Sequence, residues 1–289
     1  MVLDRLGILT DEVYPDHFAK SLDWIAEQGL KHIEVRVVDG VNIANMSDEQ
    51  VADVRRQVEA RGLSVSAIAS PLYKCALDPT RPVATGDVFG QAEESVEAHH
   101  EKLHRVIAIA KQLGARGIRI FSFWREREPE RYFDDIVAHL KKAAAVAERE
   151  GVLLLQENEP ACNGGFADEI GRIVRAVGSP AMKALWDPGN EAYGGRPAFP
   201  EGYEAIKDVL AHVHIKDAYV RPDGTSRCVP VGSGTVPFIA QLRALAEDGY
   251  DGLFTIETHF APEGGTKAAG SRMTLDAFRV LVAEAFPAK

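Results

Sequence analysis

Four side chains of the types that bind divalent metal ions follow short apolar runs in the second half of the chain. They are Glu157, Asp187, His214 and Glu257. A carboxylate at a buried strand end needs a partner, and three carboxylates together cannot all stay ionised without a cation. Oxygen ligands with one imidazole suit Mn²⁺ or Mg²⁺, with Co²⁺ or Zn²⁺ as alternatives. The pattern predicts one divalent metal ion held by these four residues, against the alternative of separate salt bridges to Arg and Lys.

Short apolar runs, each followed by a helical pattern, position these side chains. Such an alternation is typical of parallel α/β proteins. The chain has 289 residues, and a (β/α)₈ TIM barrel needs roughly 250. We therefore expect a single TIM-barrel domain over residues 1–289. The eight predicted strands are 6–10, 32–37, 64–70, 117–123, 152–158, 182–187, 211–217 and 252–258.

Side chains alternate between the two faces of a strand, so residues two apart share a face. Leu155 and Glu157 share one face, and so do Thr255 and Glu257. In a barrel the last four strands are neighbours, and their ends should bring the four metal-binding residues together. Lys216 shares a face with His214 and is therefore a candidate to hydrogen-bond a substrate oxygen. The alternative is an ion pair with Asp187 or Glu257.

Helical patterns and two long connections fill the space between the strands. The connections cover residues 71–90 and 188–203, both rich in Gly and Pro. They leave the C-terminal strand ends, where barrels build active sites, so we expect them to contact substrate rather than form plain surface excursions. The predicted helices are 17–30, 47–62, 94–114, 132–151, 237–249 and 274–286.

The composition limits the partners of the protein. The formal net charge is −10, which disfavours nucleic-acid binding. Three cysteines without a CxxC pair indicate a reducing compartment. The sequence has no apolar stretch long enough to predict a membrane span. We expect a cytoplasmic protein acting on a small molecule, as a homodimer or a homotetramer. The GSG sequence at 232–234 is too short to predict a phosphate cradle.

Five segments carry a resemblance to a known family: LLLQENEP (153–160), LWDPGN (185–190), HVHIKD (212–217), PVGSGTVPF (230–238) and FTIETH (254–259). Together they resemble the xylose isomerase-like TIM barrels, a group of sugar phosphate isomerases and epimerases and AP endonuclease 2-type barrels. Its members include tagatose/psicose 3-epimerases, hydroxypyruvate isomerase and inosose dehydratase. The resemblance spans essentially the whole chain.

The resemblance implies the same metal ligands and a catalytic role for two of them. In the epimerases the two glutamates also form the acid–base pair, which implies Glu157 and Glu257 here. Asn190 stands where the epimerases often have a histidine. Those enzymes carry an arginine shortly after the metal histidine, where this chain has Lys216 and, further on, Arg221.

The implied activity is that of a metal-dependent isomerase or epimerase of a sugar or keto-polyol, acting by proton transfer through a metal-stabilised enediolate. An alternative is a metal-dependent dehydratase of the inosose dehydratase type. A more remote one is a nuclease resembling endonuclease IV, which would need further metal ligands and a basic groove.

Further polar and aromatic residues near the strand ends are candidates for substrate contact. Glu34 and Arg36 share a strand face and could instead form a buried pair. Trp124 could wall a sugar pocket or belong to the aromatic core. The complete set of predicted substrate-binding residues is Asn190, His259, Glu34, Arg36, Trp124 and Arg221.

Overall fold

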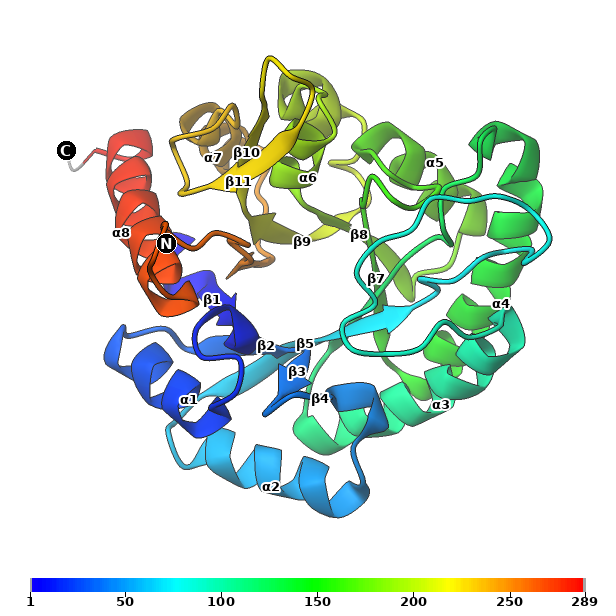
Figure 1. Cartoon of the computed structure of the whole chain (residues 1–289), viewed down its shortest axis with the longest axis horizontal. Helices are drawn as coiled ribbons and strands as arrows, with labels where there is room; N and C mark the ends of the chain where they lie inside the picture. Colours follow the sequence, from blue (N-terminus) through cyan, green and yellow to red (C-terminus); the bar gives the residue numbers. More distant parts are fainter. Residues whose placement is uncertain (1, 288–289) are drawn as a thin grey trace.

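The computed structural model describes residues 2–287. Its eight parallel strands close into a barrel in the order β1-β12-β9-β8-β7-β6-β5-β2 (Figure 1). All eight predicted strands are confirmed, with slightly different ends. The barrel strands are β1 Leu6–Leu9, β2 His32–Val35, β5 Ser64–Leu72, β6 Gly117–Ile120, β7 Leu153–Glu157, β8 Met182–Trp186, β9 Leu210–Ile215 and β12 Leu253–Ile256.

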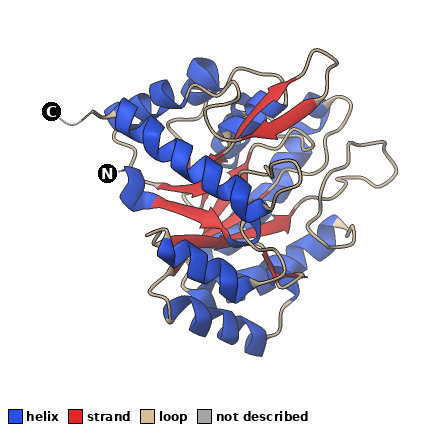
Figure 2. Cartoon of the chain, turned by 60° about the vertical axis from the view of Figure 1, so that its left-hand side comes forward, coloured by secondary structure: helices blue, strands red, loops and turns tan. Residues whose placement is uncertain are grey.

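Helices surround this barrel and cover the outer faces of its strands (Figures 1 and 2). Sequence signals set their ends. Ser47 caps α2 and exchanges hydrogen bonds with Gln50 in a capping box. Gly114 and Gly151 end α3 and α4 in the left-handed conformation. The helices are α1 Phe18–Glu27, α2 Asp48–Glu59, α3 Val96–Leu113, α4 Phe133–Glu150, α5 Ala167–Val177, α6 Pro188–Tyr193, α7 Phe238–Glu247 and α8 Lys267–Ala285.

Two kinds of core result from the alternation of side chains along the strands. Outward-facing residues such as Ile118 and Leu154 join the large cluster beneath the helices. Inward-facing Ala67, Leu155 and Leu185 form a small apolar cluster inside the barrel. The inward position that follows Leu155 on β7 is Glu157, so the interior changes from apolar to charged towards the strand ends, as the face alternation predicts.

Some elements differ from the sequence-based expectations. Helix α5 was not predicted, and α8 begins seven residues before the predicted 274. The connection 188–203 is not a plain loop, because it contains α6 and a short π-helical turn, Ala198–Gly202. Two small hairpins also flank the barrel mouth: β3 Val37–Val38 with β4 Val41–Asn42, and β10 Asp217–Val220 with β11 Ser226–Val229. The 3₁₀ turns are Val2–Arg5, Thr10–Glu12, Ile43–Asn45 and Pro129–Tyr132.

Within residues 2–287, no helix combines the length and the apolar character that crossing a membrane requires.

Candidate metal centre and substrate cavity

The four predicted metal ligands converge at the C-terminal ends of four neighbouring strands, β7, β8, β9 and β12. One potential ligand atom from each lies within 4.8 Å of the others. His214 Nδ1 is 3.2 Å from Glu157 Oε1, 3.2 Å from Glu257 Oε2 and 3.8 Å from Asp187 Oδ2. All four residues are buried. The structure therefore brings together the whole predicted set.

The spacing and chemistry of these atoms suit a divalent cation. In an octahedral site with metal–oxygen distances of about 2.1 Å, neighbouring ligands lie about 3 Å apart and opposite ligands about 4 Å apart. The separations around His214 fall in that range. Asp187 Oδ2 is buried without a hydrogen bond, although Lys216 Nζ lies 2.7 Å away. A buried carboxylate oxygen without a hydrogen bond is what a metal ligand would leave when no ion is present.

Three cationic side chains also surround the glutamates. Glu257 Oε1 accepts from Arg36 at 2.9 Å and from Arg119 at 3.1 Å, while Glu257 Oε2 lies 3.2 Å from Lys216 Nζ. Arg119 also contacts Glu157 Oε2 at 3.2 Å. The salt bridges that stood as the alternative to a metal thus exist. The arginines contact Glu257 Oε1 and Glu157 Oε2, whereas Lys216 pairs with Asp187 Oδ2 and Glu257 Oε2, two of the oxygens nearest to His214 Nδ1.

Burial opposes charge on these groups, and opposite charges nearby outweigh it. Although burial alone would raise the pKa of Glu257, Lys216 and His214 hold that pKa well below its usual range. Burial would lower the pKa of His214, but Glu34, Glu257 and Glu157 raise it well above the ordinary value. The cluster is thus a compensated arrangement of charges in which the Glu257 carboxylate stays ionised.

A fourth carboxylate contacts the other nitrogen of the histidine. Glu34 Oε2 lies 3.3 Å from His214 Nε2, and Glu34 Oε1 lies 2.7 Å from His212 Nε2. His212 also hydrogen-bonds Thr255 Oγ1 at 3.0 Å. Glu34, His212 and Thr255 form a layer beneath the metal ligands.

Two asparagines hold the loop that carries Asp187. Asn158 accepts from the Asp187 N–H at 2.7 Å and donates to the Asp187 carbonyl at 2.9 Å. The Asn190 amide nitrogen donates to the Asn158 carbonyl at 2.7 Å and lies 3.5 Å from Glu157 Oε1. Glu191, also buried, accepts from Ala167 N–H at the start of α5, and burial raises its pKa to about 8.

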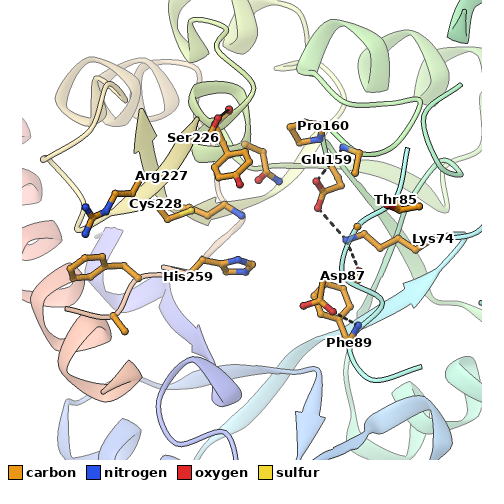
Figure 3. Close-up of a pocket in the computed structure, with 17 residues that line it drawn as sticks. Lys74, Thr85, Asp87, Phe89, Glu159, Pro160, Ser226, Arg227, Cys228 and His259 are labelled. Carbon is orange, nitrogen blue, oxygen red and sulfur yellow. Dashed lines mark hydrogen bonds and ion pairs between the residues drawn. The ribbon is translucent and has the colours of Figure 1, made fainter. Parts of the chain in front are cut away.

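Directly above the cluster is a cavity of about 620 Å³. Lys216, Asn190 and His259 belong both to its lining and to the surroundings of the metal ligands. Figure 3 shows Lys74, Asp87, Phe89 and Glu159 on one side of this cavity and Ser226, Cys228 and His259 on the other. Both long connections singled out in the sequence contribute to its wall.

The predicted substrate-contact residues divide into two groups. Asn190 and His259 line the cavity, and His259 Nε2 lies 3.4 Å from Glu257 Oε1. Glu34 and Arg36 point into the barrel, but neither lines the cavity, and each binds other partners instead of forming a pair. Arg36 is held by Asp11, Glu12 and Glu257 at 2.8 to 2.9 Å.

Trp124 and Arg221 are the other exceptions. Trp124 is buried in an aromatic cluster behind the cavity wall, which is the place that the core alternative describes. Arg221 lies at the tip of the β10–β11 hairpin, where its N–H bonds the Thr225 carbonyl, and it is not part of the cavity lining. The hairpin was not predicted, and it carries residue 221 at its tip.

Sequence reasoning missed several residues of the site. Arg119 sits on the inward face of β6, between the outward-facing Ile118 and Ile120, so strand alternation could have identified it. Lys74 and Glu159 lie on loops, and no local pattern marks them. Cys228 is half-buried at the cavity wall, whereas Cys75 and Cys162 are fully buried.

Asp217 closes the loop that contains the GSG sequence. Its carboxylate accepts from the N–H groups of Gly232, Gly234 and Val236 at 2.9 to 3.1 Å, and from Ala218. A Cβ at position 234 would lie 2.2 Å from Asp217 Oδ1, so only glycine fits there. The close approach of Asp217 thus explains the glycine at position 234.

Comparisons with known proteins agree with the barrel. The family described as xylose isomerase-like TIM barrel matches residues 22–278. An uncharacterized protein of Methanocaldococcus jannaschii is 31% identical over 89% of this chain and 84% of its own length. An inosose dehydratase of Clostridium botulinum is 24% identical over 82% of this chain and 83% of its own length.

Solved structures are similar in fold. The IolI protein with a bound zinc atom superposes with a TM-score of 0.76 at 18% identity, covering 98% of this chain and 100% of its own. A xylose isomerase-like TIM barrel protein from Mycobacterium smegmatis in complex with magnesium gives 0.70 at 19% identity, covering 96% of each chain. D-psicose 3-epimerase in the presence of D-fructose gives 0.68 at 19% identity, covering 97% of each chain.

Proposed function

The chain belongs to the xylose isomerase-like TIM barrel family, and from this premise we propose that it is a divalent-metal-dependent isomerase or epimerase of a sugar or keto-polyol. The observation that carries the proposal is the convergence of two glutamates on one histidine. Glu157 and Glu257 each place an oxygen 3.2 Å from His214 Nδ1, beneath a cavity large enough for a small polyhydroxylated molecule.

In this proposal Glu157, Asp187, His214 and Glu257 hold the cation. Mn²⁺ or Mg²⁺ suits three carboxylates and an imidazole, with Co²⁺ or Zn²⁺ as alternatives. The magnesium and zinc in the two similar structures support a divalent ion at this kind of site. When bound, such an ion supplies positive charge that stabilises an oxyanion developing on a substrate carbonyl.

The residues of the chain supply the proton transfer. We assign Glu157 and Glu257 as the acid–base pair, one accepting the proton next to the carbonyl and the other returning a proton. Both are buried beside Lys216, Asn190 and His259 of the cavity lining, and electrostatic interactions are strong in such a buried place. Lys216 Nζ faces the same cavity and donates to a substrate oxygen, and the Asn190 amide orients the substrate beside it.

A dehydratase is the second candidate, because an inosose dehydratase is among the relatives with sequence similarity over most of both chains. The same base and the same cation would serve a lyase that removes a proton and expels a β-hydroxyl. The cytoplasmic location and the homodimer or homotetramer stay predictions from the sequence.

The test is proton exchange in D₂O with added Mn²⁺, followed by NMR over a panel of ketohexoses and a keto-inositol. We expect deuterium next to the carbonyl in an isomeric product, and loss of exchange after chelation. Release of water with formation of an unsaturated ketone would favour the dehydratase. Full activity in a metal-free sample, or no exchange with any member of the panel, would overturn the proposal.

A further inference from the structure

Lys74 places a buried ammonium group in the cavity wall, apart from the four predicted metal ligands. Its side chain is 2% exposed, although it belongs to the cavity lining. Lys74 Nζ donates to Glu159 Oε2 and to the Asp87 carbonyl, each at 3.1 Å (Figure 3). The Glu159 side chain is 25% exposed and therefore reaches the open part of the cavity.

Three aromatic rings fix the position of this ammonium group. The centroids of Phe89, Phe121 and Trp124 lie 4.6, 4.5 and 5.7 Å from Lys74 Nζ. Such cation–π contacts stabilise a charged group electrostatically. A lysine ammonium has three N–H donors, and two are used within the described part of the chain. The third N–H has no hydrogen-bond acceptor among the described residues.

The Phe89 ring also connects this pair to the metal centre. Arg36 Cζ and Arg119 Cζ lie 4.6 and 5.1 Å from its centroid, on the ring that Lys74 also contacts. Both arginines bind Glu257. One aromatic ring therefore separates Lys74 from the cations that surround the catalytic carboxylate, so one molecule of sugar size could touch both ends of the cavity.

The charge of the pair indicates what it can bind. Lys74 and Glu159 neutralise each other, and together they offer one donor and one acceptor to a ligand. Hydroxyl groups match this combination, because each can donate and accept. A phosphate does not, since Glu159 and the nearby Asp87 would repel it.

We propose that Lys74 and Glu159 form a second binding end of the cavity, which takes the uncharged hydroxyl groups of the substrate farthest from its carbonyl. The substrate is then an unphosphorylated sugar or polyol with at least two hydroxyl groups beyond the reacting carbons. This inference rests on the proposed function, because the metal centre must bind the reacting end.

Binding of inert polyols tests the inference without catalysis. The probes are D-mannitol, D-mannitol 1-phosphate and glycerol, titrated by calorimetry into the Mn²⁺-loaded protein. Three variants are compared with the parent chain. Lys74→Met removes the ammonium and keeps most of the stem, Glu159→Gln removes the negative charge, and Lys102→Met is the matched control, since Lys102 pairs with Glu94 outside this cavity.

We expect the parent chain to bind mannitol more tightly than glycerol or mannitol 1-phosphate. Lys74→Met should weaken mannitol about tenfold or more and leave glycerol nearly unchanged, because one charged hydrogen bond is lost. Glu159→Gln should shift the preference towards mannitol 1-phosphate, since the ammonium is no longer neutralised. Lys102→Met should behave as the parent.

The opposite results would overturn the inference. These are tighter binding of the phosphate by the parent chain, no detectable mannitol binding, or equal mannitol binding by the parent and both site variants. If Lys74→Met does not fold, as judged by circular dichroism, the Glu159→Gln result decides. Failure of the proposed function alone would give a different result from failure of this inference. No proton exchange would be observed, but the Lys74-dependent preference for mannitol would persist.

Discussion

Glu34 Oε2 lies 3.3 Å from His214 Nε2, on the side of the imidazole ring opposite Glu157 and Glu257. A carboxylate in this place accepts a hydrogen bond from Nε2–H, and this tautomer leaves the Nδ1 lone pair directed at the ligand cluster. Such partners fix the tautomer and raise the basicity of a metal-binding histidine.

Glu34→Gln should therefore weaken Mn²⁺ binding about 10–100-fold, measured by isothermal titration calorimetry. Glu126→Gln is the control, because Glu126 is buried and paired with Arg81, away from the ligands. Equal Mn²⁺ affinities of the Glu34 and Glu126 variants would show that Glu34 does not orient His214.

The two glutamates of the cluster should differ in their structural importance. Glu257 compensates Arg36, Arg119 and Lys216, whereas Glu157 pairs with Arg119. Removing one partner of a buried ion pair costs about 3–5 kcal/mol, because the remaining charge is left uncompensated.

Both Glu257→Gln and Glu157→Gln should lower proton exchange by about 10²–10⁴-fold. Glu257→Gln should also lower the midpoint of thermal unfolding more than Glu157→Gln does, measured by calorimetry in metal-free buffer. Identical midpoints for the two variants would contradict the assignment of these ion pairs.

Glu191 predicts a pH dependence of stability. Burial raises its pKa from 4.5 to about 8. A carboxyl group with a raised pKa in the folded state contributes stability that is fully present below pH 4.5 and is lost as the pH rises through 8. The slope is at most about 1.4 kcal/mol per pH unit.

Glu191→Gln keeps an acceptor for the Ala167 N–H and cannot ionise. Its unfolding midpoint should fall less between pH 6 and pH 9 than that of the parent chain, measured by thermal denaturation. Glu201→Gln on the exposed surface serves as the control. A parallel fall for the Glu191 variant and the parent would refute the role of Glu191.

Cys228 should be the site of inhibition by a thiol reagent. It lines the cavity, while Cys75 and Cys162 are fully buried. Burial raises its pKa to about 11, and the thiolate is the reactive form. Alkylation by N-ethylmaleimide should therefore be slow at pH 7 and accelerate about tenfold per pH unit.

Mass spectrometry of peptides should locate the modification, and enzymatic activity should fall in parallel with it. Cys228→Ser is the matched variant and should resist inhibition. Loss of activity in the Cys228→Ser chain at the same rate would place the sensitive group elsewhere.

The sequence predicted the barrel and the four residues that converge at its strand ends because both follow from local patterns. Strand alternation placed Glu157 and Glu257 on inward faces, and the order of the strands made their ends neighbours. The roles of these residues, and the identity of the metal, stay predictions. Arg119 obeyed the same alternation but was read as part of an apolar strand.

The parts of the site that the sequence did not predict depend on contacts between segments that lie far apart in the chain. Asp11 and Glu12 follow the first strand and hold Arg36, which no spacing along the chain reveals. Lys74 and Glu159 meet across 85 positions. Arg221 lies outside the cavity lining, on a hairpin after β9 that packs against α6, and the sequence does not show this contact between elements.

The loop around Gly232 and Gly234 has the inward-turned N–H groups of an anion-binding nest, and Asp217 already supplies the anion. The Asp217 carboxylate thus occupies this nest. A ligand phosphate could bind there only by displacing that carboxylate, which is part of the same chain. Asp217 directly follows Lys216, so the same bonds anchor the backbone from which Lys216 reaches the cavity. The orientation of that ammonium group is therefore controlled by a turn outside the cavity lining, and substitutions there would act on the active site from a distance.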